Sequence, residues 1–203
     1  SSNVTLKYNF TKGEKFSYRL TTTTNGNQVI QGDSLVKMKS SQVSSYTFDF
    51  AVLDVDKDNV ASLNTVISSM KIDADINGQK INYDSKANNP PQVKAQFMEY
   101  ETITNSPFLV NINSKGEVIR VANMDKIISK LVAAQPKGTK INAEQKAAFS
   151  KSISQVLQPI VQLIFKELAD KPVAKDSTWT RQYPGNLAVF QMVNTAKYKL
   201  QDF

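Results

Sequence analysis

Residues 71–84 read KIDADINGQKINYD, and this stretch decides the fold. Apolar and polar residues alternate on both sides of the dipeptide Asn77-Gly78. The apolar members of the alternation are Ile72, Ala74, Ile76, Ile81 and Tyr83. A period of two is typical of β-strands, and Asn-Gly between two such runs indicates a tight hairpin turn. The stretch therefore predicts two antiparallel strands joined by a type I′ turn.

The same stretch also resembles the acidic loop of an EF-hand calcium site. The residues that match this loop are Asp73, Asp75, Asn77, Gly78 and Asp84. An EF-hand needs a helix on each flank, whereas these flanks alternate as strands do, and Lys80 replaces the usual apolar residue. The hairpin explains the same residues, so we expect no metal here. A second acidic turn, at Asp54, Asp56 and Asp58, lacks the glycine and glutamate of such a loop and is expected to be solvated.

Strand patterns continue on both sides of this hairpin. Towards the N-terminus they cover residues 6–10, 16–24, 29–38, 44–53 and 60–66. Turns are predicted between them at residues 11–14, at Asn25-Gly26 and at residues 54–59. After the hairpin, residues 85–91 are predicted to form a loop, and residues 93–103 fit either a helix or a strand. Residues 108–112 and 117–122 are predicted strands around a turn at residues 113–116.

The pattern becomes helical after residue 122. Apolar residues share one helical face at Met124, Ile127, Ile128, Leu131 and Val132. Asn123 is the predicted N-cap of this helix. A second helix is predicted to begin at Asn142, with Gln145 three residues later as its partner in a capping box. Pro159 stands inside the second helix and is predicted to kink or break it, because proline lacks an N–H group.

The second helix carries an apolar stripe that supplies the candidate binding residues. They are Phe149, Ile153, Val156, Leu157, Ile160 and Ile164. This spacing is typical of a core-facing helix side, but it also fits a groove for a partner or the wall of an apolar ligand cavity. A curved antiparallel sheet followed by kinked apolar helices can enclose a space of lipid size. All three interpretations remain open at the level of sequence.

The fold class predicted from these patterns is α+β and mainly β. We expect a curved antiparallel sheet, open or forming half a barrel, with a two-helix segment packed on it. One domain is expected over residues 1–203, with strands at 1–122, helices at 123–170 and strands again at 171–203. The last strands are predicted to surround a turn at Pro184-Gly185. The strand pattern has no closing turn at Phe203, so the natural protein is expected to continue.

Histidine and cysteine are both absent from the 203 residues. Their absence excludes Ser-His-Asp and Cys-His catalysis, cysteine-ligated metals and disulfides. No nucleotide-binding or metalloprotease motif is present, so we expect a protein without catalytic residues or cofactors that is not an enzyme. One carboxylate alternative is Glu99 with Glu101. On one face of a strand they would lie about 7 Å apart, which fits an inverting glycosidase.

The net charge of +7 does not by itself indicate nucleic acid binding. Arginine, the better phosphate ligand, occurs only at Arg19, Arg120 and Arg181, and the lysines are scattered along the chain. We therefore expect no nucleic acid partner. No apolar run is long enough to span a bilayer as a helix. The sequence starts without a signal peptide, which fits a cytoplasmic protein or a mature, trimmed form.

Several short motifs resemble an uncharacterised family of exported bacterial proteins. They are residues 7–16 (KYNFTKGEKF), Asn77-Gly78 with Tyr83-Asp84-Ser85, residues 110–118 (VNINSKGEV), and Pro172-Val173 with Trp179. The family occurs mainly in Bacteroidota, often as lipoproteins, and carries a domain-of-unknown-function label. The resemblance spans nearly the whole chain. It implies an exported protein, located in the periplasm, at the outer membrane or on the cell surface.

The predicted sheet with helices is also similar, more loosely, to lipoprotein carriers of the LolA/LolB type. Asp33-Ser34-Leu35 and Asp176-Ser177-Thr178 are similar to the Bacteroidota O-glycosylation signal. The lipobox cysteine is lacking, so membrane association would need a lipid anchor that is absent from this chain. The absence of histidine and cysteine, the absence of a catalytic motif and the predicted sheet with helices lead us to expect a non-enzymatic exported module that binds a partner protein or an apolar ligand such as a lipid. A structural subunit of a cell-envelope complex and a carboxylate-based carbohydrate hydrolase are the alternatives.

Overall fold

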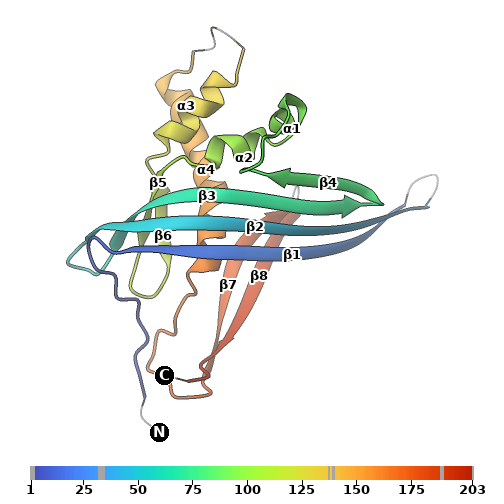
Figure 1. Cartoon of the computed structure of the whole chain (residues 1–203). Coiled ribbons are helices and arrows are strands. Elements are labelled where there is room, and N and C mark those ends of the chain that lie inside the picture. The colour runs from blue at the N-terminus through green and yellow to red at the C-terminus, as the bar shows by residue number, and fades with distance from the viewer. Residues whose placement is uncertain (1–2, 32–34, 137, 139, 188–189, 203) are drawn as a thin grey trace.

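The computed structural model describes residues 3–31, 35–136, 138, 140–187 and 190–202. Among these residues, six strands form one antiparallel sheet, two strands form another, and four helices accompany them (Figure 1). The strands are β1 (Lys15–Gln31), β2 (Leu35–Val55), β3 (Ala61–Ile76), β4 (Gln79–Asp84), β5 (Phe108–Ile112), β6 (Val118–Ala122), β7 (Thr178–Leu187) and β8 (Phe190–Lys199). The helices are α1 (Pro91–Gln96), α2 (Met98–Ile103), α3 (Asp125–Ala133) and α4 (Ala143–Ile164). The chain is mainly β and its sheet is open, which confirms the predicted fold class.

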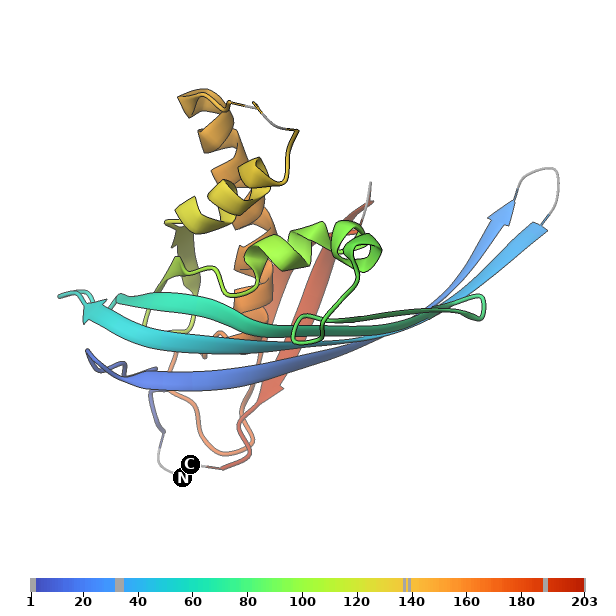
Figure 2. The ribbon, with the colours of Figure 1, turned by 45° about the horizontal axis from the view of Figure 1, so that its top comes forward.

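The six-stranded sheet follows the order of the chain closely. Its order is β1-β2-β3-β5-β6, and β4 also pairs with β3. β3 is long enough to hold two neighbours, because residues 71–76 pair with β4 and residues 61–65 pair with β5. Every pair is antiparallel, as expected for strands joined by short turns. The long strands are curved, and α4 runs across them on one side of the sheet (Figure 2).

The turn predicted at Asn25-Gly26 is wrong. β1 runs through this dipeptide, and Gly26 pairs with Ser40 of β2. A Cβ on Gly26 would meet the side-chain Oγ of Ser40 at 2.8 Å, so the glycine leaves room for this side chain. Continuous pairing along β2 thus overrides the local turn preference. The predicted strand over residues 29–38 is therefore divided between β1 and β2, and the one over residues 44–53 is the second half of β2.

The turn predicted at Asn77-Gly78 is confirmed. Both residues have a positive φ, 52° and 87°, as a type I′ turn requires, and Ile76 pairs with Gln79 across it. The carboxylate of Asp75 accepts a hydrogen bond from the backbone N–H of Gly78 at 2.7 Å. A hairpin therefore accounts for the residues that resemble a calcium loop. Asp33-Ser34 of the first glycosylation-like triplet lies outside the described residues.

The strand predicted over residues 6–10 is wrong. The described N-terminal segment forms a single β-bridge, between Val4 and Val173, and the Tyr8 N–H donates a hydrogen bond to the Ser114 carbonyl at 2.7 Å. Its alternating side chains bring the rings of Tyr8 and Phe10 against Phe165 instead. Burial of aromatic surface, not strand pairing, explains this alternation. The turn over residues 11–14 is confirmed, with Gly13 at a φ of +86°.

The helical segments differ from the predictions at two points. The sequence of residues 93–103 fits either a helix or a strand, and the structure places this segment in α1 and α2. Asn123 is not the N-cap of α3: its φ is +55°, and Met124 occupies the cap position without a side-chain hydrogen bond. The left-handed backbone of Asn123 instead turns the chain from β6 into α3. No helix in the described part of the chain is long and apolar enough to cross a membrane.

The predicted capping box of α4 is confirmed. The Asn142 side chain accepts a hydrogen bond from the Gln145 N–H at 2.8 Å, and the Gln145 side chain accepts one from the Asn142 N–H at 2.9 Å. Pro159 lies inside α4 but does not break it. Pro159 and Gln155 are both exposed, so water can reach the Gln155 carbonyl that loses its helical partner. α4 therefore continues as one helix from Ala143 to Ile164.

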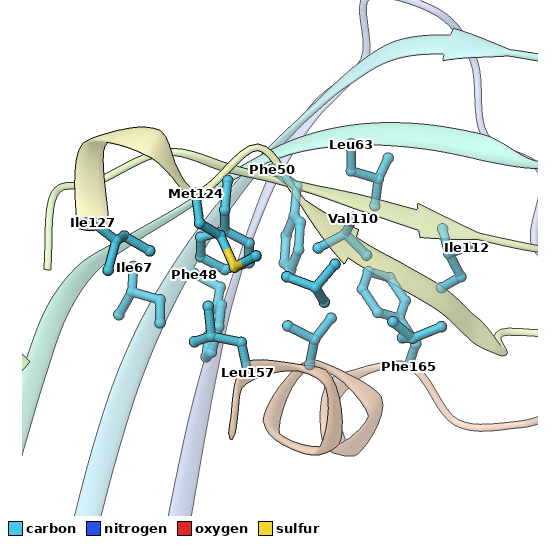
Figure 3. Close-up of a cluster of buried hydrophobic side chains, with 14 of the residues drawn as sticks. Phe48, Phe50, Leu63, Ile67, Val110, Ile112, Met124, Ile127, Leu157 and Phe165 are labelled. Carbon is cyan, nitrogen blue, oxygen red and sulfur yellow. The ribbon is translucent and has the colours of Figure 1, made fainter. Parts of the chain in front are cut away.

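The core lies between the six-stranded sheet and α4. Its buried side chains come from the sheet, from α4 and from the start of α3, and they point towards one another (Figure 3). They include Phe48, Phe50, Leu63, Ile67, Val110, Ile112, Met124, Ile127, Leu157 and Phe165. Each such burial stabilises the fold by about 1.5–3 kcal/mol before the loss of chain entropy is counted. Side chains thus fill the space where the sheet and α4 face each other.

β7 and β8 form a separate two-stranded sheet. The turn predicted at Pro184-Gly185 is wrong, because β7 runs through it and Pro184 pairs with Val193. A proline is tolerated there because a two-stranded sheet leaves one side of each strand unpaired. The hairpin is attached near its base, where Trp179 Nε1–H donates a hydrogen bond to the Glu167 carbonyl at 2.9 Å.

Candidate functional site

α4 is the element that carries all the predicted binding residues, and it has three different sides. Successive residues of a helix are about 100° apart, so residues three, four or seven apart share a side. Leu157 and Val161 lie on the first side, which faces the sheet, and both are fully buried. Ile153, Ile160 and Ile164 flank this side and are half-buried against the same core.

The second side of α4 shields the free edge of β6. Gln162 Oε1 accepts a hydrogen bond from the Val118 N–H at 2.9 Å, and Gln158 Nε2 donates one to the Val118 carbonyl at 2.9 Å. Gln162 Nε2 also donates to the Gly116 carbonyl at 2.8 Å. Ser154 Oγ donates to the Val121 carbonyl at 3.4 Å. These side chains occupy the hydrogen-bonding groups that another strand would need in order to pair with β6.

The third side of α4 is apolar and exposed. Phe149, Val156 and Leu163 are seven residues apart, and 38%, 53% and 46% of their surfaces are accessible. With Ile153 and Ile160 between them, they give a spacing of alternately four and three residues. This is the spacing of the contact positions in packed helices. We call Phe149, Ile153, Val156, Ile160 and Leu163 the α4 seam.

The six predicted site residues thus all lie on α4, but they do not form one continuous surface. Leu157 belongs to the core, Ile164 lies at the edge of the core, and the other four belong to the seam. Leu163 was not among the predicted residues, although its distance of seven residues from Val156 is a signal that identifies it.

An aromatic cluster lies at the C-terminal end of α4. Phe165 is buried there, and its ring contacts five others: Tyr8, Phe10, Phe16, Tyr18 and Phe50. The cluster extends from the core to the surface, where Tyr18 is 47% exposed. The sequence predicts strands over residues 6–10, 16–24 and 44–53, but nothing in these patterns brings their aromatic residues together with Phe165. They lie on three segments that are distant in sequence, so no local pattern indicates the cluster.

Charged groups beside the cluster hold the β7–β8 hairpin to the chain after α4. Arg181 forms ion pairs with Glu167 at 3.2 Å and with Asp170 at 3.0 Å, and it donates a hydrogen bond to the Leu168 carbonyl at 2.7 Å. Burial raises the pKa of Glu167, although Arg181 opposes this effect. Burial and a hydrogen bond with Tyr198 raise the pKa of Tyr183 as well. These charged and hydroxyl groups therefore stabilise the β7–β8 hairpin and its attachment to the chain after α4.

The carboxylate pair Glu99 and Glu101 does not have the predicted geometry. Both residues lie on helix α2, not on a strand. Residues two apart on a helix point about 200° apart, so the two carboxylates diverge. Glu101 accepts a hydrogen bond at 2.8 Å from the hydroxyl of Tyr83, whose pKa is raised by burial and by this contact. Glu101 thereby connects α2 to β4.

Fold and site together define an open-sheet α+β protein in which one helix shields a sheet edge and exposes an apolar seam. A family model matches residues 58–203, most of the chain, and the chain belongs to that family: DUF6263, a family of unknown function. The resemblance to an uncharacterised family is confirmed at this level. The match begins in the turn before β3 and includes the whole of α4. Comparisons with curated proteins and with solved structures find no match.

Proposed function

We propose that this protein is a non-catalytic binding module that packs an amphipathic helix of a partner protein along the α4 seam. The exposed third side of α4 is the observation that carries the proposal. The other two sides already have partners, the core and the edge of β6. Phe149, Val156 and Leu163 are large apolar side chains that remain accessible to water on the third side.

The spacing of the seam favours a helix as the occupant. Apolar residues at alternate intervals of four and three form a stripe on which another helix can insert its own side chains. Each exposed seam residue that becomes buried adds up to about 1.5 kcal/mol, because roughly half of its surface is already covered. Together the exposed positions can sustain a specific contact, once the entropy lost on association is subtracted.

An exported location is part of the proposal. The short motifs that resemble exported proteins of Bacteroidota support it. The open sheet crossed by a helix supports the looser likeness to lipoprotein carriers of the LolA/LolB type. Fractionation of the native host, with antibody detection in periplasm and outer membrane, tests the location. Detection of the protein in the cytoplasm alone contradicts it.

A second candidate is binding of an apolar ligand such as a lipid. The aromatic cluster favours this function, because it connects the core to the surface at Tyr18. Solvent extraction of the purified protein followed by mass spectrometry tests it. A stoichiometric lipid that is lost in the variant Tyr18→Asp supports the ligand. A preparation free of lipid contradicts it.

Site-specific photo-crosslinking distinguishes the two candidates. A photoreactive phenylalanine analogue at position 156 is compared with the same analogue at position 155, which is exposed on the polar side of α4. The proposal expects protein crosslinks from position 156 to a segment with helical apolar spacing, and none from position 155. Loss of these crosslinks in Leu163→Glu supports the seam further. Equal yields from both positions, or lipid adducts alone, contradict a helical partner.

A further inference from the structure

β1 is a long and regular strand at the edge of the sheet. Within the described part of the chain it pairs with β2 alone, over seventeen consecutive positions without a register shift. The pairing of β2 with β3 has two shifts, and that of β5 with β6 has one. An edge strand without a bulge presents an even row of unpaired N–H and C=O groups on its outer side. Figure 2 shows β1 along the margin of the curved sheet.

The other edges of this sheet are protected, whereas β1 lacks the usual protection. The edge of β6 is covered by side chains of α4. β4 is only six residues long and carries Lys80 and Asp84. Residues 20–31 of β1 contain no charged residue and no proline. Charges, prolines, bulges and short length are the features that keep edge strands from pairing, and this part of β1 has none of them.

The face of β1 that looks towards α4 also has uncovered apolar surface. Phe16, Tyr18 and Leu20 alternate on this face, and the ring of Tyr18 packs 6.2 Å from that of Phe165. Tyr18 is nevertheless 47% exposed. A strand placed beside β1 would put every second side chain on the same face and would cover Tyr18.

The charges near this edge indicate the chemistry of such a strand. Lys15 and Arg19 lie on β1, and the whole chain carries a net charge of +7. Two copies of this protein would repel each other, whereas an acidic segment would be attracted. The row of backbone groups requires an extended segment as the occupant. The apolar face requires apolar residues at every second position of that segment, and the positive charge favours acidic residues at the positions between them.

We propose that the outer edge of β1 binds an extended segment of another protein by strand addition, and that this segment alternates apolar with acidic residues. The outer edge of β1 is a different surface from the α4 seam. The main chain supplies the affinity in this mode, and the alternating side chains supply the specificity. The bound segment becomes an additional edge strand of the sheet.

A synthetic peptide of about ten residues that alternates valine with glutamate or threonine is the probe. Its binding to the intact protein is measured by fluorescence anisotropy. The control is the same peptide with every backbone amide methylated, which removes the hydrogen-bond donors from both edges of the peptide but keeps its side chains. We expect binding of the first peptide and at least tenfold weaker binding of the second. Equal binding of both, or no binding of either, overturns strand addition.

Charge-reversal variants locate the bound peptide. Arg19→Glu is compared with Lys57→Glu, which makes the same change of charge in the turn between β2 and β3. We expect Arg19→Glu to weaken peptide binding about two- to fivefold and Lys57→Glu to leave it nearly unchanged. Equal effects of both variants overturn the assignment to β1. Dimers of the protein itself, without peptide binding, would replace the foreign strand by a second copy.

Discussion

The ring of Phe165 lies against the ring of Phe50, with centroids 5.2 Å apart and planes at 68°. This edge-to-face contact joins the last turn of α4 to the middle of the sheet. Phe165 is the C-cap of α4, and Phe50 is a buried residue of β2. Aromatic pairs in this arrangement add about 0.5–1.5 kcal/mol to the burial of their surfaces. The contact therefore fixes where α4 ends relative to the sheet.

Replacing Phe165 should be among the most destabilising changes in the core. Phe165→Ala removes a buried ring that contacts five others, and we expect a loss of about 3–5 kcal/mol. Urea unfolding measures this change. Phe149→Ala on the exposed seam is the matched control, and it should cost less than about 1 kcal/mol. Similar losses in both variants would contradict the central position of Phe165.

Gln162 should be essential for the shielding of β6. Gln162→Ala leaves the Val118 N–H and the Gly116 carbonyl without their partners, at a cost of about 1–3 kcal/mol. Hydrogen exchange at the Val118 amide gives a local measurement, and the amide should exchange faster in the variant. Gln155→Ala on the exposed side serves as the control. An unchanged exchange rate at Val118 in Gln162→Ala would show that α4 does not protect this edge.

Gly116 should tolerate no side chain. Its φ is +87°, and a Cβ there would lie 2.5 Å from the Lys166 carbonyl oxygen and 2.6 Å from the Tyr8 ring. Gly13 has nearly the same φ, +86°, but no atom of the described residues lies within 4 Å of such a Cβ. Both alanine variants incur the penalty of a left-handed backbone, about 1 kcal/mol. Gly116→Ala should cost clearly more in urea unfolding, and equal losses would mean that the end of α4 moves aside freely.

The parts of the fold that the sequence predicted correctly are those decided locally. The hairpin of β3 and β4 has its turn and both strands within residues 71–84, so alternation and the Asn-Gly dipeptide suffice. Asn25-Gly26 carries the same signal, yet β1 continues through it. The deciding partner, Ser40, is fourteen positions away, and its pairing with Gly26 depends on the length of β2. The Asn-Gly dipeptide alone therefore cannot indicate that β1 continues through it.

The candidate site was predicted in part for a similar reason. The apolar stripe of α4 is visible in the sequence because a helix imposes its own period. Which members of the stripe are buried depends on β2, β3 and β5, which lie far away along the chain. Leu157 therefore belongs to the core and Val156, its neighbour, to the exposed seam. The aromatic cluster around Phe165 joins three distant segments and has no sequence period at all.

The stability of the attachment of β7 and β8 should depend on pH through Glu167. Burial raises the pKa of this carboxyl above its ordinary value of 4.5, against the opposing effect of Arg181. The folded protein thus holds the proton more tightly than the unfolded chain, so the stability that Glu167 contributes is present at low pH and is lost as the pH rises through the raised pKa. Glu167→Gln, which does not titrate, should therefore gain stability relative to the native protein between about pH 4 and pH 7.

Arg181→Gln should instead make the free energy of unfolding depend more steeply on pH, because it removes the charge that lowers the pKa of Glu167. Urea unfolding across this pH range measures both variants, and parallel curves for native protein and Glu167→Gln would contradict the assignment.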